Sequence, residues 1–379
     1  MRTNPNPSGL TRRQVAQALA SLALPAGAVA TGQGLPAPGQ DAALQTLADR
    51  AGQDGSNTHA VLVERGGRLL AASYFTGRDK PVGHWFSRET RFTPDTLHDL
   101  RSISKSVTGL LFGIAQGRGL IGPLDQPVLG FFPEHAALAT PERRALTLQH
   151  LLTMSPGFAW DETSVAYGHG DNSEEQMLRA ADPVRHVLSL PMVQPPGSRF
   201  VYCGGTTQLL AEIIERRSGR RLAEFAREAL FAPLGIEPFE WREGWHDKAM
   251  AFAGLRLRPA DLLKLGRLML EGGRWQGRSV VPTDWVTASQ RAQLPASDGW
   301  DYGYQWWVAR ADAPGAEQRL GSGVAGFAGI GNGGQRLIGV PALDLVLVVN
   351  AGRYNQPANG RASMVLARAL IQQLAGARP

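Results

Sequence analysis

The spacing of apolar residues differs between the ends of the chain and its middle. Short apolar runs at 59–63 and 68–74 flank a glycine-containing turn, which is typical of a β-hairpin. Further strand-like runs lie at 304–308, 335–340 and 343–350. Apolar residues recur at helical spacing elsewhere and predict helices at 41–51, 102–116, 146–154, 206–218, 222–231, 259–270 and 361–374. The stretch 76–95 has no regular period and is expected to be irregular.

Strands at both ends with helices between them predict an α+β fold. We expect one antiparallel sheet, flanked by helices, that takes its strands from both ends of the chain. The sheet domain is expected to comprise residues 41–121 and 286–379, with a mostly helical insert at 122–285. A cleft between sheet and insert is the natural place for a ligand site.

The first 40 residues differ in character from the rest. The paired residues Arg12 and Arg13 precede a weakly apolar stretch and the small-residue sequence Ala28-Val29-Ala30. This order is typical of a twin-arginine signal peptide, expected at 1–30, and a Gly/Pro-rich linker is expected at 31–40. A helical or disordered extension is the alternative. Export to a bacterial periplasm, or secretion, is the preferred interpretation.

Composition and charge exclude several classes of protein. The chain has 379 residues, 43% of them hydrophobic, with 45 Gly and a single Cys, so disorder, collagen-like repetition and a disulfide framework are excluded. No apolar run reaches the roughly 20 residues that span a bilayer. Removal of the N-terminal segment would reduce the formal net charge from +6 to +3. Because the remaining arginines are scattered among acids, no nucleic-acid partner is expected.

The first candidate for chemistry is Ser102-Ile103-Ser104-Lys105, at the start of a predicted helix. Positions i and i+3 share one face of a helix, so the Lys105 amine can reach the Ser102 hydroxyl. That hydroxyl needs a base, and half-burial of a lysine among apolar residues such as Val107 and Leu110 is expected to lower its pKa. The positive end of the helix dipole also favours an oxyanion. A capping serine with a solvated lysine is the alternative.

The second candidate is Tyr202, in an extended piece between Pro195-Pro196-Gly197 and the next predicted helix. A tyrosine there can reach over the cleft toward a lysine, whose positive charge lowers the pKa of a phenol. A packed tyrosine with a solvated hydroxyl is the alternative. The neighbouring Cys203 has no histidine close in sequence and is interpreted as a core residue.

Four separated blocks of sequence together resemble the serine β-lactamase-related superfamily, which contains class C β-lactamases, penicillin-binding proteins, esterases and D-aminopeptidases. The blocks are Arg-Ser-Ile-Ser-Lys-Ser-Val-Thr at 101–108, Leu-Leu-Thr-Met at 151–154, Pro-Pro-Gly-Ser-Arg-Phe-Val-Tyr at 195–202 and Pro-Leu-Gly-Ile at 233–236. Within that superfamily the sequence is most similar to serine hydrolases of the 6-aminohexanoate-dimer hydrolase type. The resemblance runs from about residue 59 to the C-terminus and implies a β-lactamase/transpeptidase-like fold.

The resemblance also implies roles for individual residues. Ser102 would be the acyl-accepting nucleophile and Lys105 its amine partner. Tyr202 would pass a proton to the leaving amine or alcohol. The backbone N–H groups of Ser102 and Asn332 would form the oxyanion hole.

Two departures from the family pattern limit the expected substrates. The family's third motif, Lys-Thr-Gly, aligns with Gly329-Ile330-Gly331, and an alignment shifted two residues toward Phe327 is the alternative. Only the final glycine of the motif, Gly331, is retained, and it is expected to bind substrate. The family's Tyr-x-Asn becomes Tyr202-Cys203-Gly204, without its amide. Three nearby residues are candidates to replace that amide: Thr206, Thr207 and Gln208. Of these, Gln208 is expected to bind substrate. Both losses disfavour efficient β-lactamase activity and leave neutral ester or amide cleavage open.

Other sequence features carry weaker signals. Two G-x-G-x-x-G matches, at 117–122 and 329–334, do not lie between a strand and a helix, so no dinucleotide site is expected. The eight histidines show no metal-ligand spacing, and neither a metal nor another cofactor is expected. The tryptophan-rich segment 300–307 is interpreted as core. The polar loop after Trp160 is interpreted as solvated, with a pocket for a cationic substrate end as the alternative; its polar residues are Asp161, Glu162, Asp171 and Asn172.

The sequence therefore predicts a serine hydrolase that cleaves a small ester or amide through an acyl-enzyme intermediate on Ser102. The alternatives are a D-amino-acid peptidase or weak β-lactamase, and a catalytically inactive binding protein of the same fold, which the missing Asn and Lys-Thr motivate. The expected partner is a small-molecule substrate, without nucleic acid or a membrane span. The acyl group, the leaving group and the oligomeric state stay open.

Overall fold

An eight-stranded antiparallel sheet joins the N-terminal and C-terminal parts of the described chain. The computed structural model describes residues 41–379 except 245–246, 298 and 377–379, so the expected signal peptide and linker lie outside the described residues. The strands follow in spatial order: β10 (Leu294–Pro295), β11 (Asp301–Tyr302), β12 (Trp307–Ala309), β13 (Gly326–Gly331), β14 (Gln335–Val340), β15 (Leu345–Ala351), β1 (Thr58–Arg65) and β2 (Arg68–Tyr74). The predicted antiparallel sheet, with strands from both ends of the chain, is confirmed.

The turn between β1 and β2 closes because two glycines accept a left-handed backbone. Gly66 and Gly67 have φ of 58° and 75°. Residues with a Cβ adopt such positive φ angles only at a cost in free energy. The Glu64 carboxylate accepts a hydrogen bond from the Gly67 amide at 3.0 Å. On its other edge β1 pairs with β15, with Val61 opposite Val349, so the N-terminal hairpin completes a sheet that the C-terminal strands begin.

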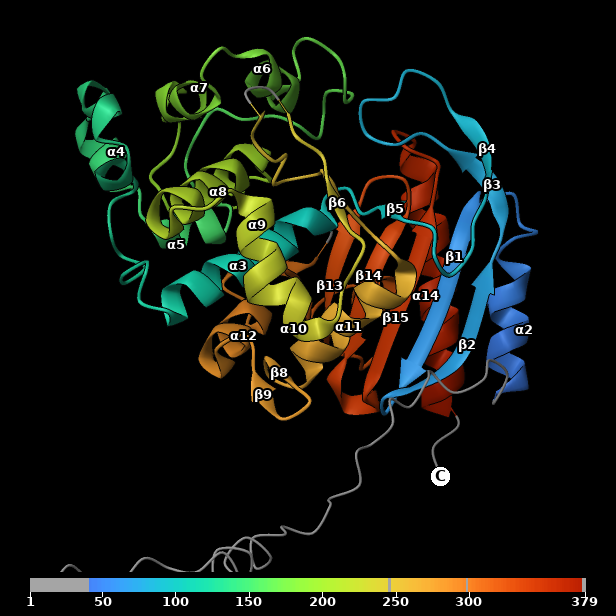
Figure 1. Cartoon of the computed structure of the whole chain (residues 1–379). Coiled ribbons are helices and arrows are strands. Elements are labelled where there is room, and N and C mark those ends of the chain that lie inside the picture. The colour runs from blue at the N-terminus through green and yellow to red at the C-terminus, as the bar shows by residue number, and fades with distance from the viewer. Residues whose placement is uncertain (1–40, 245–246, 298, 377–379) are drawn as a thin grey trace, which may run out of the picture. The chain divides into compact units, whose positions relative to one another are not determined.

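The central strands are apolar on both faces because each face is covered. Along β1, Val61 and Val63 pack with the helices α2 (Ala42–Arg50) and α14 (Pro357–Gly376). The alternating residue Leu62 belongs to the core on the opposite face. That second face is covered by α3 (Ile103–Gly117) and α11 (Pro259–Leu270). Figure 1 shows α2 and α14 on one side of the sheet and α3, α8 (Gly204–Ser218) and α11 on the opposite side.

Further helices make up much of the remaining described chain, and α8 among them packs against α3. The α-helices of this part are α4 (Pro141–Arg144), α5 (Leu148–Leu152), α6 (Ser173–Arg179), α7 (Pro183–Ser189), α8 (Gly204–Ser218), α9 (Leu222–Ala226), α10 (Ala232–Leu234), α12 (Thr283–Gln290) and α13 (Ala316–Arg319). Shorter helical turns lie at η1 (Val128–Phe131), η2 (Pro133–Leu138), η3 (Arg227–Phe231) and η5 (Pro341–Leu343). The α11 helix contacts β14 and β15 directly, so this helical part also covers the sheet.

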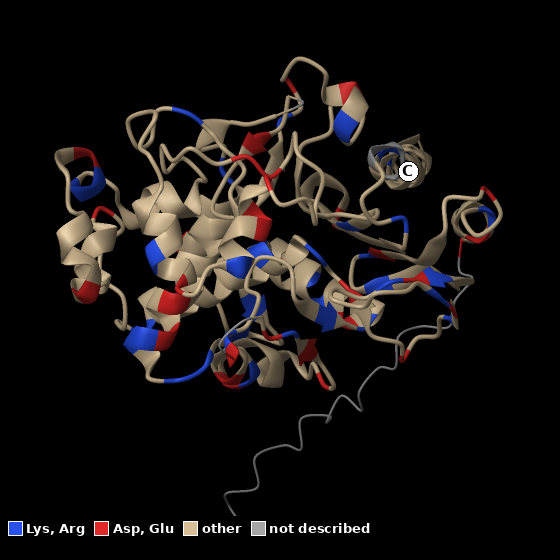
Figure 2. Cartoon of the chain, turned by 90° about the horizontal axis from the view of Figure 1, so that it is seen from above, with Lys and Arg blue, Asp and Glu red and all other residues tan. Residues whose placement is uncertain are grey.

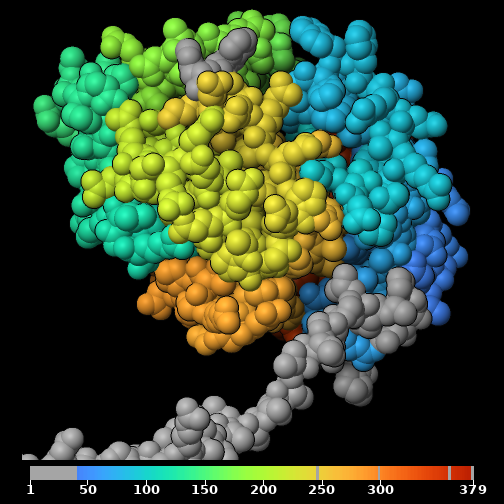
Figure 3. Space-filling view, viewed as in Figure 1, coloured from blue at the N-terminus to red at the C-terminus, as the bar shows by residue number. Residues whose placement is uncertain are grey.

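Three small sheets complete the described fold. The strands β3 (Thr76–Asp79) and β4 (Arg88–Arg91) form a hairpin inside the stretch that we expected to be irregular. The strands β5 (His98–Asp99), β7 (Leu255–Leu257) and β6 (Glu240–Trp241) pair in that order, and β8 (Arg274–Trp275) pairs with β9 (Arg278–Ser279). In Figure 3 the surface of the segment around β6 accordingly borders that of the segment leading to α3.

Two features of the sheet differ from the sequence-based expectation. The strand predicted at 304–308 begins later, at Trp307, because Gln305 has a φ of 64° that breaks the extended backbone. The strand β13 was not predicted, since three of its six residues are glycine. Tight packing explains those glycines: a Cβ at Gly329 would lie 3.1 Å from a side-chain carbon of Ile103 in α3.

Charged residues of both signs are interspersed over the described elements, as Figure 2 shows. None of the helices between residues 41 and 376 is long and apolar enough to cross a membrane.

Candidate active site

Ser102 lies directly before α3, at the edge of a cavity. The preceding residue, Arg101, has a φ of 52°, so the chain turns sharply before the helix begins. The Ser102 side chain makes no capping hydrogen bond, contrary to the capping alternative. The Ser104 side chain forms hydrogen bonds with the backbone instead. Its hydroxyl donates to the Arg101 carbonyl at 2.7 Å and accepts from the Leu255 amide at 3.0 Å. The Ser102 hydroxyl is thereby left for other partners.

Lys105 lies one helical turn after Ser102 and is 1% exposed. Its ammonium donates to the Ser102 hydroxyl at 3.3 Å and to the Phe252 carbonyl at 3.2 Å. A carboxylate oxygen of Glu162 is 3.8 Å away. The spacing of serine and lysine therefore produces the contact that helical geometry predicts.

Tyr202 comes to the same place from the segment before α8. Its side chain interacts electrostatically with those of Ser102 and Lys105. The Lys105 nitrogen is 4.7 Å from the centre of the tyrosine ring, and Trp307 of β12 stacks on the ring at 5.7 Å. A side chain that is distant in sequence thus meets the pair Ser102 and Lys105, and a packed tyrosine with a solvated hydroxyl does not describe this geometry.

The charge state of Lys105 differs from the expectation. Burial acts to lower its pKa, as we expected, but the nearby Tyr202 and the carboxylates Glu162 and Glu174 outweigh it, and the pKa is raised. Burial raises the pKa of Tyr202, and Lys105 opposes that rise only in part. The expected lowering of the lysine pKa is therefore wrong, and the resting site holds an ammonium beside a neutral phenol.

Two carboxyl groups that the sequence analysis did not assign to the site account for this difference. Glu162 is buried, and one of its oxygens accepts from the Trp160 indole at 2.8 Å and from the Gly204 amide at 2.7 Å. Glu174 lies at the start of α6, where burial, reinforced by the charge of Glu162, raises its pKa to about 8. The polar loop after Trp160 is thus partly turned inward, and its interpretation as solvated is wrong for Glu162 and for the buried Asn172.

A cavity of about 600 Å³ opens beside Ser102 and carries charges of both signs. Its basic side chains are Lys80, His84, Arg101 and Arg242, and its acidic side chains are Glu174, Glu175 and Glu243. Tyr167 and Asn172, from the loop that carries Glu162, also line it. The cavity therefore offers polar contacts on more than one side of Ser102.

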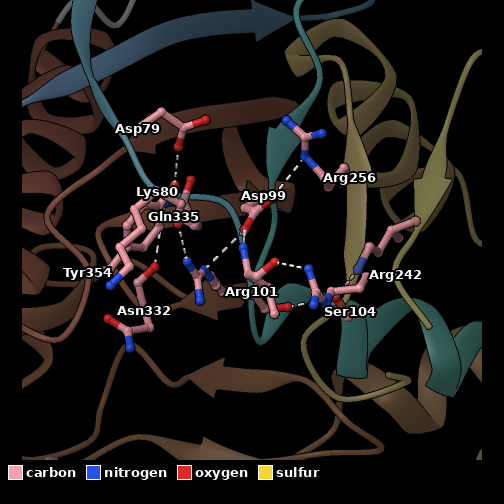
Figure 4. Close-up of polar contacts among 12 residues, drawn as sticks. Asp79, Lys80, Asp99, Arg101, Ser104, Arg242, Arg256, Asn332, Gln335 and Tyr354 are labelled. Carbon is pink, nitrogen blue, oxygen red and sulfur yellow. Dashed lines mark hydrogen bonds and ion pairs between the residues drawn. The ribbon is translucent and has the colours of Figure 1, made fainter. Parts of the chain in front are cut away.

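Arg101 is held firmly at this cavity, as Figure 4 shows. Its guanidinium donates to the Lys80 carbonyl at 2.7 Å, pairs with Asp99 at 3.4 Å and lies 4.0 Å from the centre of the Tyr354 ring. The Tyr354 hydroxyl donates in turn to Asp79 at 3.0 Å. These contacts tie β3, β5 and the segment after β15 to the residue that precedes Ser102.

The remaining predicted site residues have different positions. Asn332 lines the cavity with Ser102, as an oxyanion hole made from their amides requires, and its side chain is held by Asn355 at 2.6 Å. Gly331 lies under the chain before Ser102, where a Cβ would come within 2.4 Å of the Leu100 carbonyl oxygen. Its role in the structure is to permit close approach, and it is not among the residues that line the cavity.

Gln208 lies away from Ser102, in α8. Its amide bridges the Ala249 carbonyl and the Ala251 amide, both at 3.2 Å, and so supports the segment that leads to Phe252. It lines a neighbouring cavity of about 370 Å³. The other two candidates for the missing amide are also engaged elsewhere, since Thr206 donates to Cys203 and Thr207 to Gln305.

The structure also settles the surroundings of Tyr202. Cys203 is fully buried, as predicted for a core residue, and burial raises its thiol pKa. Trp300 and Trp306 are buried in the core, whereas the ring of Trp307 contacts Tyr202. No short motif marks Glu162 or Glu174; the only available signal was a group of acidic residues in one loop between two predicted elements.

Comparison with known proteins agrees with this arrangement. The profile of the beta-lactamase family matches residues 43–369. The 6-aminohexanoate-dimer hydrolase of Paenarthrobacter ureafaciens is 29% identical over 311 residues, which make up 77% of this chain and 71% of that protein. A beta-lactamase of Escherichia coli is 24% identical over 223 residues, 56% of this chain and 55% of that protein.

Solved structures share the fold. The octameric penicillin-binding protein homologue from Pyrococcus abyssi has a TM-score of 0.65 at 21% identity, covering 87% of this chain and 77% of that one. Simvastatin synthase from Aspergillus terreus has a TM-score of 0.64 at 18% identity, covering 88% and 99%.

Proposed function

Because the chain belongs to the beta-lactamase family and is a serine hydrolase of the acyl-enzyme type, we propose that Ser102, Lys105 and Tyr202 cleave a small amide or ester. The observation that supports these residues is their convergence. The Ser102 hydroxyl accepts from Lys105 at 3.3 Å, and the Lys105 nitrogen lies 4.7 Å from the centre of the Tyr202 ring. The Ser102 side chain can therefore attack a carbonyl carbon, while Lys105 stabilises negative charge and Tyr202 transfers the proton.

The charge states suggest how the proton moves. The Ser102 oxygen attacks the carbonyl carbon of the substrate, and the Tyr202 oxygen takes the serine proton as it gives its own proton to the leaving nitrogen or oxygen. The ammonium of Lys105 stays charged and stabilises the negative charge that develops on the phenol and the serine oxygen. A water molecule then hydrolyses the acyl-enzyme, with Tyr202 accepting and returning a proton in the same way.

The charges of the cavity favour a substrate that carries both signs. Arg101 and Lys80 suit a carboxylate, and Glu175 suits an amine. The 29% identical relative is named as a hydrolase of the 6-aminohexanoate dimer. That dimer carries an amine at one end and a carboxylate at the other, and an amide joins its two halves. β-Lactams are disfavoured because positions 329 and 330, Gly and Ile, offer no polar side chain to a substrate carboxylate.

Replacement of Ser102 by Ala tests the proposal. We expect at least a 10³-fold loss of turnover of p-nitrophenyl acetate and of 6-aminohexanoate dimer, because the attacking oxygen is removed. The wild-type protein should also lose activity on labelling by a fluorophosphonate, and mass spectrometry should place the adduct on Ser102. Undiminished turnover by the folded Ser102→Ala variant would refute the mechanism. Rapid labelling by a fluorescent penicillin would favour the β-lactam or peptidase alternative.

A further inference from the structure

The space beside Gly204 is occupied by two carboxyl groups. A Cβ atom at position 204 would lie 3.1 Å from an oxygen of Glu162 and 3.2 Å from an oxygen of Glu174. Both distances are shorter than ordinary van der Waals contact. The side chain that position 204 lacks is therefore replaced by groups from a loop and a helix about 30 to 40 residues earlier in the chain.

Glu162 is held in this space by contacts that leave one oxygen directed at Lys105. One oxygen accepts from the Trp160 indole and from the Gly204 amide. The other oxygen is buried and has no hydrogen-bond partner among the described residues. It lies 3.8 Å from the Lys105 ammonium. A buried carboxylate oxygen is costly without a partner, and here its compensation is the charge of the lysine.

We propose that Glu162 is a positioning residue for acyl transfer, which holds Lys105 against Ser102 in place of the side-chain amide that is absent at position 204. This inference rests on the proposed function of the same site and adds a residue to it. The geometry has two parts: the carboxylate fixes the ammonium, and the bare backbone at Gly204 makes room for the carboxylate while donating its N–H.

Several charged or titratable groups face Glu162, so its removal has an electrostatic signature. These groups are Lys105 of α3, Tyr167 of the same loop, Glu174 of α6, Tyr202 and Cys203 before α8, and Tyr302 of β11. The charge of Glu162 raises the pKa of both Lys105 and Tyr202. Neutralising Glu162 should therefore lower both pKa values and move the alkaline side of the pH–rate profile to lower pH.

The first test is Glu162→Gln, in which the amide oxygen can keep the bonds from Trp160 and Gly204. Its NH₂ group then faces the Lys105 ammonium and cannot accept a hydrogen bond from it. We expect kcat to fall roughly 10- to 100-fold with a much smaller change in KM, a smaller loss than the roughly 10²- to 10⁴-fold effect of a group that itself transfers the proton. The alkaline limb should shift to lower pH. The matched control is Glu228→Gln, an exposed carboxylate paired with Arg118 and Arg220, which should leave kcat and the profile unchanged.

The second test exchanges the two positions. Gly204→Asn alone should lose activity because its Cβ meets both carboxyl groups. Glu162→Ala alone should lose activity because Lys105 loses its partner. The double variant Glu162→Ala/Gly204→Asn removes the nearer of the two obstructing carboxyl groups and returns an amide oxygen near Lys105. It should be at least tenfold more active than either single variant, a non-additivity expected only of groups in contact.

The outcomes separate this inference from the proposed function. Circular dichroism and melting curves establish that each variant is folded. The inference is overturned if Glu162→Gln keeps wild-type kcat and pH profile, or if it loses activity with an unshifted profile and the double variant gives no rescue, since a structural role alone predicts that pattern. If Ser102→Ala is fully active, the proposed function itself fails, whatever the Glu162 variants do.

Discussion

At the scale of single residues, burial alone does not determine the charge of Lys105. Its side chain is almost fully buried, a setting that removes hydration and favours the neutral amine. Three neighbours, Tyr202, Glu162 and Glu174, act in the opposite direction and together raise its pKa. In the proposed mechanism Lys105 is thus an electrostatic partner, and proton transfer falls to the phenol of Tyr202.

Glu174 supplies a prediction at the same scale. Its pKa is raised to about 8, well above the 4.5 of a free glutamate, so the folded protein holds a proton that the unfolded chain releases. Between about pH 4.5 and pH 8 stability must therefore fall as the pH rises, and this contribution is constant above that range. Glu174→Gln resembles the protonated form at every pH. The variant should match the wild-type melting temperature at pH 5 and exceed it at pH 9.

Thermal unfolding followed by circular dichroism at pH 5, 7 and 9 measures this difference. The control is Glu175→Gln, at the next position of α6, whose carboxylate pairs with Arg179 at 2.8 Å. The difference in melting temperature between Glu175→Gln and the wild type should not increase with pH in this way. An equal melting temperature of wild type and Glu174→Gln at pH 9 would contradict the raised pKa.

At the scale of elements, the approach of β13 to the start of α3 places the two candidate oxyanion amides on one cavity. The strand comes so close that a Cβ at Gly331 would lie 2.4 Å from the Leu100 carbonyl oxygen. Gly331→Ala should therefore push the strand away from the segment before Ser102. We expect a loss of about 1–3 kcal/mol in the free energy of unfolding, as for other overpacked sites. We also expect a lower kcat, because Asn332 moves with the strand.

Urea unfolding and steady-state kinetics on one ester substrate measure the two effects. Gly130→Ala is the matched control, because a Cβ there meets nothing within 4 Å. It should change neither quantity appreciably. A Gly331→Ala variant with wild-type kcat would show that the position of Asn332 does not depend on this close approach.

At the scale of residues 41–379 as a whole, the sheet separates two hydrophobic cores with different relations to the site. The core under α2 and α14 includes Leu370, and the core around α3 includes Leu110. Only the second core supports the helix that carries Lys105. Leu370→Ala and Leu110→Ala should each cost about 2–5 kcal/mol of unfolding free energy through the cavity that they leave.

The activities of these two variants should differ. At a temperature where both remain folded, Leu370→Ala should keep the wild-type kcat, and Leu110→Ala should lower it, because α3 relaxes toward the space left behind. Denaturant melts and kcat measured on the same samples check both halves of the prediction. A large loss of kcat in folded Leu370→Ala would mean that the two cores are coupled through the sheet.

The sequence determined much of the local structure, because periodicity is a property of neighbouring residues. The predicted helix 259–270 and strand 335–340 coincide with α11 and β14, and Ser102 and Lys105 meet because helical geometry fixes positions i and i+3. The glycine-rich β13 carried no such signal, since its residues are selected by close packing against α3.

Only the tertiary structure decided the electrostatics of the site. Coulomb energy depends on distance in space, and Glu162, Glu174 and Tyr202 reach Lys105 from separate segments that no sequence spacing relates. The same holds for Gly204. In the sequence it indicates only that the family's amide side chain is absent, whereas in the folded protein the carboxylate of Glu162 fills the space beside it.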